Sequence, residues 1–157
     1  MSLTLTPTLL SKLHAHLEAG YPYEACGILI GEIDANNIDK RLSDVVLVDN
    51  AWTPDSEASD TRRGQTETQH NRFLIAPEDI ARADRAAAKR NLDVIGFFHS
   101  HPDSPSVPSE TDREWAWPVI SFMIVQVQQG KATTTQSWIL RDDRTMFDEE
   151  SLHVIDG

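Results

Sequence analysis

The chain has 157 residues, which is the length of one ordinary domain, so residues 1–157 are expected to form a single domain with its own core. With 39% hydrophobic and 25% charged residues, the composition is that of a globular protein and excludes a fibrous or disordered chain. The formal net charge of −11 argues against nucleic acid or an anionic membrane as the main partner. It leaves a basic protein or a neutral peptide segment as candidates.

The compartment is indicated by the N-terminus and the cysteine content. The first residues lack a basic leader followed by an uninterrupted apolar run, and no segment has the length of a membrane span. Cys26 is the single cysteine, which excludes an internal disulfide framework and a cysteine-only zinc site. We therefore expect a reduced, cytoplasmic protein.

The first third of the chain predicts a helix and two strands. Thr6 can cap a helix that starts at Pro7, where a missing N–H has no cost. Leucines at three- and four-residue spacing mark one face of this helix, and Gly20 can end it. The apolar run Glu24–Gly31 and the β-branched run within Arg41–Val48 predict two strands.

The middle of the chain begins with a long polar segment, Thr53–His70. A segment of this length without predicted structure is more often functional or mobile, and we interpret it as a flap over the tail of a substrate. Phe73–Ile75 predicts a short strand. Pro77–Arg90 predicts a helix, because acidic residues lie in its first turn and basic residues in its last. The nearly continuous apolar run Asp93–Phe98 predicts a central strand covered on both faces.

The last third predicts further strands around one helix. A loop stiffened by prolines leads to a helix expected to start at Ser109, followed by an apolar strand over Val119–Val127. Ala132–Leu140 alternates like a half-exposed partner strand, and the residues from Met146 predict an edge strand or a short helix. This order of elements indicates an α/β fold with a mixed β-sheet flanked by helices.

Two histidines at the end of the central strand indicate chemistry. His99 and His101 are two residues apart in extended chain, so both imidazoles point to one side. Asp112, in the first turn of the next helix, can supply a third zinc ligand and leave one tetrahedral position open, as in catalytic sites. The pattern has an alternative explanation, since an isolated HxH occurs by chance. Ser109 and Asp112 also have the spacing of a helix capping box, which needs no chemistry.

Other reactive side chains have less support from their surroundings. His14 and His16 share the two-residue spacing, but on a helix they lie on different faces, so we reject them as ligands. Cys26 is expected to be a small buried strand residue, because the sequence places no base near it. Trp115 and Trp117 are expected to pack the last helix, with the alternative that they wall one side of a cleft.

The segment His99–Asp112 resembles the JAMM (MPN-plus) metalloprotease signature HxH, seven residues, S-x-x-D. Residues 22–29, PYEACGIL, are similar to the family's segment around an upstream glutamate. Ser100 matches the serine usually found between the two histidines and is expected to shape the turn. The resemblance covers the whole chain in element order, and it implies the cytidine-deaminase-like three-layer architecture of that family.

The resemblance also implies a role for each matching residue. His99, His101 and Asp112 would hold one zinc ion per chain. Glu24, which by itself would be interpreted as a surface residue beside a turn, would act as general base and then as general acid. Ser109 would donate a hydrogen bond to the developing oxyanion. At none of these positions does the sequence depart from the family pattern.

The form of the motifs resembles the stand-alone bacterial and archaeal branch, whose members are associated with ubiquitin-like sulfur-carrier proteins of the β-grasp fold. This implies hydrolysis of the peptide or isopeptide bond after a C-terminal Gly-Gly, with release of an amino acid such as cysteine. Two alternatives are a catalytically silent MPN-type binding module and a metal-dependent hydrolase of another small amide. A cysteine hydrolase built on Cys26 is a third.

Overall fold

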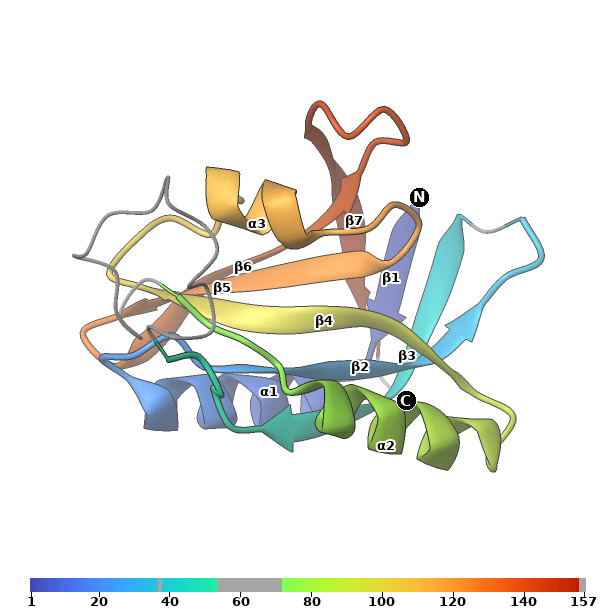
Figure 1. Ribbon diagram of the computed structural model, residues 1–157, viewed down its shortest axis with the longest axis horizontal. Helices are drawn as coiled ribbons and strands as arrows, with labels where there is room; N and C mark the ends of the chain where they lie inside the picture. The colour runs from blue at the N-terminus through green and yellow to red at the C-terminus, as the bar shows by residue number, and fades with distance from the viewer. Residues whose placement is uncertain (37, 54–71, 156–157) are drawn as a thin grey trace.

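The computed structural model describes residues 1–36, 38–53 and 72–155 of the chain (Figure 1). Of the predicted flap, Thr53–His70, only Thr53 is among the described residues, and the rest lies outside them. In chain order the elements are β1 (Ser2–Leu5), α1 (Pro7–Gly20), β2 (Cys26–Ile33), β3 (Asp39–Val48), α2 (Pro77–Ala88), β4 (Asp93–Pro102), α3 (Glu110–Trp115), β5 (Ser121–Gln128), β6 (Lys131–Leu140) and β7 (Phe147–Val154).

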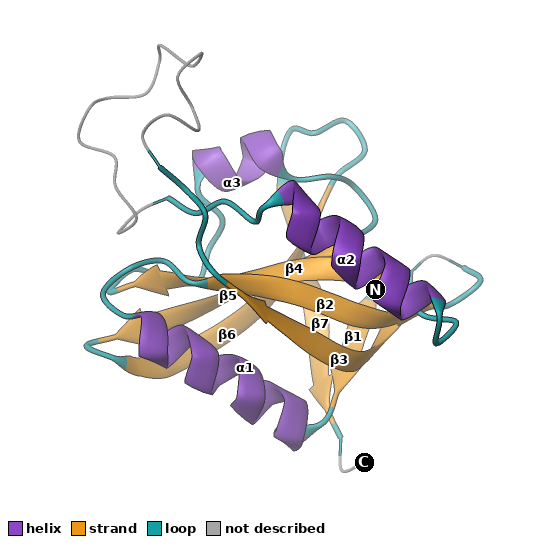
Figure 2. Ribbon diagram, turned by 60° about the horizontal axis from the view of Figure 1, so that its bottom comes forward, coloured by secondary structure: helices purple, strands orange, loops and turns teal. Residues whose placement is uncertain are grey.

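The described strands form a mixed sheet that closes on itself in the order β1-β3-β2-β4-β5-β6-β7. β4 and β5 run parallel, as do β1 and both of its partners, whereas the other neighbours are antiparallel. Helix α1 covers one face of the sheet, and α2 and α3 lie on the other side (Figure 2). The predicted α/β class, a mixed sheet flanked by helices, is confirmed.

Helix α1 forms as its sequence predicts. The Thr6 side chain accepts a hydrogen bond from the backbone N–H of Leu9 at 3.3 Å, which satisfies one of the donors left over at a helix start. Leu13 and Leu17, one turn apart, are fully buried against the sheet. No helix in the described ranges has the length and apolar character needed to cross a membrane.

Strands β2 and β4 are apolar on both faces because helices cover both faces of the sheet at these strands. Leu29 of β2 packs in the cluster that contains the α1 leucines. Ile28 and Phe97 pack instead with Ala83 and Ala87 of α2. This explains the nearly uninterrupted apolar runs that predicted β2 and β4. Strand β4 continues past its predicted end as far as Pro102, so both histidines of the motif lie inside it.

Two elements at the ends of the chain differ from the predictions. The first predicted element is a helix, but strand β1 precedes it, and Leu3 and Leu5 of β1 are almost completely buried. The residues from Met146 are expected to form an edge strand or a short helix. They form a strand, but the predicted edge position is wrong. β7 pairs with β6 along one side and with β1 along the other, so it closes the sheet.

The short strand predicted for Phe73–Ile75 is not a strand in this described part of the chain. The Leu74 carbonyl accepts one backbone hydrogen bond, from Ala51 N–H at 2.9 Å. The Leu74 N–H donates to a side chain, Asn50 Oδ1, at 3.0 Å. The Asn50 side chain therefore accepts the hydrogen bond that the backbone of a neighbouring strand would accept in a β-ladder.

A fully buried ion pair lies inside the closed sheet. Lys40 Nζ of β3 and Glu150 Oε2 of β7 are 3.0 Å apart, and both side chains are 0% exposed. The other carboxylate oxygen of Glu150 accepts hydrogen bonds from Ser121 of β5 and Ser137 of β6, each at 2.7 Å. The Glu150 carboxylate thus connects β7 with three other strands, β3, β5 and β6.

Candidate functional site

The two histidines of the motif project from one face of β4. Side chains alternate along a strand, so His99 and His101 share a face. Both edges of β4 are paired here, with Cys26 of β2 opposite His99 and Gln126 of β5 opposite His101. The two histidines are 1% and 8% exposed, respectively. The backbone positions of both histidines are therefore fixed by the pairing of β4 with its neighbouring strands.

Ser100 points away from the histidines and holds the segment that carries Glu24. The Ser100 N–H donates to the Ala25 carbonyl, and the Ala25 N–H donates to Ser100 Oγ, both at 2.9 Å. This pairing extends the β2–β4 ladder, so Glu24 faces the same side as the two histidines. One carboxylate oxygen of Glu24 and one nitrogen of each imidazole lie within 4.8 Å of one another. Ser100 thus connects Glu24 to the histidine strand.

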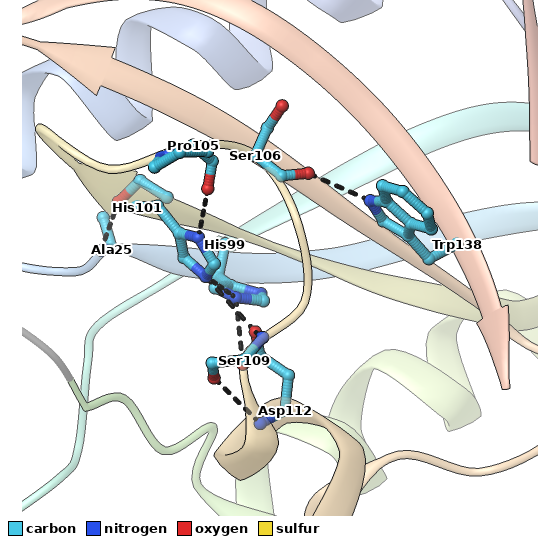
Figure 3. A network of polar contacts seen from close by, with 9 residues as sticks. Ala25, His99, His101, Pro105, Ser106, Ser109, Asp112 and Trp138 are labelled. Atoms are coloured by element: carbon cyan, nitrogen blue, oxygen red, sulfur yellow. Dashed lines mark hydrogen bonds and ion pairs between the residues drawn. The ribbon is translucent and has the colours of Figure 1, made fainter. Parts of the chain in front are cut away.

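Asp112 reaches the histidines from the start of α3. Its carboxylate Oδ2 accepts a hydrogen bond from the Ser109 N–H at 2.8 Å, and its N–H donates to Ser109 Oγ at 3.2 Å. The capping box is therefore present, and it orients the carboxylate. Oδ1 and Oδ2 lie 3.2 Å from Nε2 of His99 and of His101, respectively (Figure 3). The capping and ligand interpretations hold together.

The loop after β4 sets the orientation of the second imidazole. His101 Nδ1 is 2.7 Å from the Pro105 carbonyl, and because a carbonyl only accepts, this nitrogen carries the proton. The loop is itself anchored on β6, where Ser106 Oγ donates to Gln136 at 2.6 Å and the Trp138 indole donates to the Ser106 carbonyl at 3.0 Å. In the neutral form that a metal ligand has, His101 therefore carries its lone pair on Nε2, the atom nearest Asp112.

The first imidazole is oriented by stacking. The rings of Phe73 and His99 lie 4.3 Å apart with an angle of 24° between their planes. His99 Nδ1 is buried and has no hydrogen-bond partner in the part of the chain that the structure describes. Phe73 cannot be predicted in this role from the sequence, because its run of apolar residues predicts a strand.

The spacing of the nitrogen and oxygen atoms fits a metal ion of the size of zinc. The two Nε2 atoms are 3.2 Å apart, the same distance that separates each of them from Asp112. Ligand bonds of about 2.0–2.1 Å in a tetrahedral site place ligand atoms about 3.3–3.4 Å apart. Charge-assisted hydrogen bonds between the same groups are shorter, about 2.7–2.9 Å. His99, His101 and Asp112 are therefore suited to bind a divalent cation.

Burial and neighbouring charges shift the pKa values of the cluster. Burial raises the pKa of Glu24 to about 8, and the Asp112 charge adds to this while His101 opposes it. Burial also disfavours the charged form of Asp112, but the two histidines hold the pKa of Asp112 well below its usual value. A divalent cation bound beside Glu24 would lower the pKa of Glu24. The site thus holds a buried carboxylate suited to proton transfer near neutral pH.

A cleft opens beside these residues. Its volume is about 150 Å³. Its described walls are mostly apolar, and they are formed by Glu24, Trp52, Arg72, Phe73, Leu74, Ile75, Ile80, Phe97, His99, Thr111, Asp112, Trp115, Trp117 and Phe122. Trp115 and Trp117 are 55% and 57% exposed. They therefore wall the cleft, as the alternative interpretation holds, and do not pack α3 into the core.

The remaining candidate residues lie elsewhere in the structure. The Cys26 side chain is completely buried, and burial raises the pKa of its thiol to about 12, so the structure speaks against a hydrolase built on this cysteine. His14 Nε2 contacts Thr135 Oγ1 at 2.8 Å. His16 Nε2 contacts the Cys26 carbonyl at 2.9 Å. Both histidines have structural partners, in agreement with their rejection as ligands.

One further residue at the site was missed from the sequence. Asn50 Nδ2 donates a hydrogen bond to the carbonyl of Glu24 at 2.9 Å. An asparagine directly after a predicted strand is typical of a turn, and this was the only local signal. The contact joins residues 26 positions apart, so spacing along the chain does not indicate it.

Known proteins with similar sequences indicate the family of the chain. Residues 6–141 match the family model described as prokaryotic homologs of the JAB domain. A desampylase from Haloferax volcanii is 34% identical over 104 residues, which are 66% of this chain and 62% of that protein. A desampylase from Pyrococcus furiosus is 38% identical over 72 residues, 45% of this chain and 48% of that protein. The matches thus span less than two thirds of either relative.

Solved structures extend the similarity to the whole fold. The solution structure of a protein from Desulfitobacterium hafniense has a TM-score of 0.77 and 25% identity, and the match covers 99% of this chain and 94% of that one. A solution structure from Salinibacter ruber has a TM-score of 0.69 and 30% identity, with 99% and 92% covered. Together with the family match over residues 6–141, these findings show that the chain belongs to the prokaryotic homologues of the JAB domain.

Proposed function

We propose that this chain is a zinc-dependent peptidase acting on a ubiquitin-like sulfur-carrier protein. It hydrolyses the peptide or isopeptide bond after the carrier's C-terminal Gly-Gly and releases an amino acid such as cysteine. The observation that carries the proposal is the convergence of His99, His101 and Asp112 with the buried carboxylate of Glu24 at one cleft. The name desampylase, given to two relatives, supports hydrolysis of conjugates of a ubiquitin-like protein.

The residues of the site divide the reaction between them. His99, His101 and Asp112 would hold the zinc ion, which would supply Lewis acidity that polarises a carbonyl and makes water a better nucleophile near neutral pH. Glu24 takes a proton from the attacking water and returns it to the leaving amine. Ser109 Oγ accepts its hydrogen bond from Asp112 N–H, so its own proton is available to the oxyanion of the tetrahedral intermediate.

The cleft favours a slender substrate. At about 150 Å³ it is smaller than the roughly 300–1,000 Å³ of ordinary small-molecule sites. Phe73 lies directly against His99, so bulk is restricted beside the candidate ligands. Glycine has no Cβ, and a Gly-Gly tail can lie extended where larger residues would collide. These features support a carrier tail over another small amide as the substrate.

The proposal includes the compartment and the cofactor. We expect one zinc ion per chain, and we expect the protein to act in the cytoplasm, where its single buried cysteine stays reduced. A binding module without activity would not require a carboxylate as deeply buried as Glu24, which is 6% exposed beside two imidazoles. Burial of such a group has a cost in stability. Its presence therefore favours an enzyme over a silent module.

Hydrolysis of defined conjugates tests the proposal. Zinc-loaded protein is incubated with a Gly-Gly-ending β-grasp carrier joined either to cysteine by a peptide bond or to lysine by an isopeptide bond. We expect the mass spectrum to show the carrier shortened to its Gly-Gly end, and a Gly-Ala end to lower the rate about tenfold or more. Protein treated with a chelator is the control. An unchanged carrier mass with loaded protein would contradict the proposed activity.

A further inference from the structure

We infer that Asn50 is a positioning residue, which holds Glu24 and one wall of the cleft in a fixed relation. The inference rests on the proposed role of Glu24 as general base. Asn50 lies just beyond the end of β3, and its side chain is within hydrogen-bonding distance of three separate segments of the cleft. Neither the sequence motif nor the family match assigns it a role.

The Asn50 side chain makes four hydrogen bonds with described residues. Its Nδ2 donates to the carbonyls of Glu24 and Arg72, both at 2.9 Å. Its Oδ1 accepts from the N–H groups of Trp52 and Leu74, both at 3.0 Å. An asparagine amide has two N–H donors and an oxygen with two lone pairs, so these bonds use its full capacity. These bonds also fix the orientation of the amide, because a flipped amide would place its own N–H groups against those of Trp52 and Leu74.

Glu24 depends on this contact because it lies outside the sheet. The ladder between β2 and β3 ends at the pair Cys26 and Val48, two residues after Glu24. On the β4 side, Ala25 is held by Ser100. On the β3 side, the hydrogen bond from Asn50 to the Glu24 carbonyl takes over from the ladder. The backbone that carries the candidate base is thus tied on both sides.

The same amide holds the cleft wall. The Asn50 side chain is hydrogen-bonded to the backbone of residues 72 and 74, and Phe73 between them stacks on His99. Trp52, which also lines the cleft, is bonded to Asn50 through its N–H. Loss of the amide therefore releases the base and the wall together. A displacement of about 1 Å at such a group is enough to lower a rate about 100-fold.

The isosteric variant Asn50→Asp tests the role. Aspartate keeps the size and the acceptor oxygen but replaces the two donors with a second acceptor, which faces the carbonyls of Glu24 and Arg72. We expect kcat to fall about 10- to 100-fold at unchanged zinc content. The matched control is Asn91→Asp in the turn after α2, which adds the same charge at an exposed position and leaves kcat unchanged.

A double-mutant cycle separates positioning from general destabilisation. Because Asn50 holds the cleft wall as well as Glu24, we expect Asn50→Asp to lower kcat by a clearly smaller factor once Glu24→Gln is present. An equal fold-loss with and without Glu24→Gln would overturn the inference, as would an unchanged kcat in Asn50→Asp alone. If the aspartate variant does not fold, Asn50→Ala is used in the same cycle, because it removes the bonds without adding a charge.

Hydrogen exchange provides a readout that needs no substrate. In Asn50→Ala we expect the amides of Trp52 and Leu74 to exchange at least about tenfold faster than in the wild type, because their acceptor is gone. In Asn50→Asp the acceptor remains, and both amides stay protected. Unchanged protection in Asn50→Ala would overturn the inference. The wild type could cleave no conjugate while the two Asn50 variants show the expected exchange rates. That result would contradict the proposed function but would support the hydrogen bonds of Asn50.

Discussion

Replacement of Glu24 by glutamine is expected to lower kcat about 10²- to 10⁴-fold, the range attributed to a general acid–base group. Glutamine has nearly the shape of glutamate but cannot take a proton from water. Glu24 is 6% exposed, so bulk water cannot easily substitute for its carboxylate. The measurement is the initial rate of carrier shortening at saturating conjugate, followed by mass spectrometry.

Glu32→Gln is the matched control for this variant. Glu32 lies on β2, the strand that follows Glu24, and its side chain is exposed. The control removes the same charge from the surface and is expected to leave kcat at the wild-type value. Zinc binding by Glu24→Gln should remain close to that of the wild type, since the ligands are unchanged. A Glu24→Gln rate near the wild-type rate would remove this residue from the mechanism.

Replacement of Lys40 by methionine is expected to lower the free energy of unfolding by about 3–5 kcal/mol. The Glu150 carboxylate would keep its bonds to Ser121 and Ser137 but lose the charge of Lys40, and both side chains of this pair are 0% exposed. Domains are stable by about 5–15 kcal/mol, so this loss is a large share of the total. Urea denaturation followed by tryptophan fluorescence measures it.

A second substitution distinguishes charge from packing. In Lys40→Met with Glu150→Gln, the amide oxygen still accepts from the two serines, but no unpaired charge is buried. We therefore expect the double variant to recover most of the lost stability. Lys131→Met, at the exposed start of β6, is the control and should change stability by less than about 0.5 kcal/mol. A double variant as unstable as Lys40→Met would contradict this explanation.

The candidate ligands could be predicted from the sequence because their signals are local. The alternation of a strand places His99 and His101 on one face, and the capping box places Asp112 at the start of the next helix. Glu24 required a family resemblance, since a glutamate beside a turn carries no signal of burial. The structure adds that the β2–β4 register brings Glu24 to the histidines.

Long-range features could not be predicted in this way. Lys40 and Glu150 are 110 residues apart, and each looks like an exposed strand residue in sequence. Strand β1 is four residues long, too short for an alternation pattern to be recognised. The apolar run Phe73–Ile75 has the composition of a strand, but its partner is the side chain of Asn50. In each case the deciding contact depends on the closed sheet or on a single side chain.

The central claim is that His99, His101 and Asp112 together bind one metal ion, and isothermal titration of metal-free protein with zinc tests it most directly. We expect one zinc per chain in the wild type and an affinity loss of at least about 100-fold in Asp112→Asn, because a ligand is changed and not only its support. His153→Ala, at an exposed position of β7, should bind like the wild type. A wild type that binds no zinc, or an Asp112→Asn variant that binds it equally well, would contradict the account.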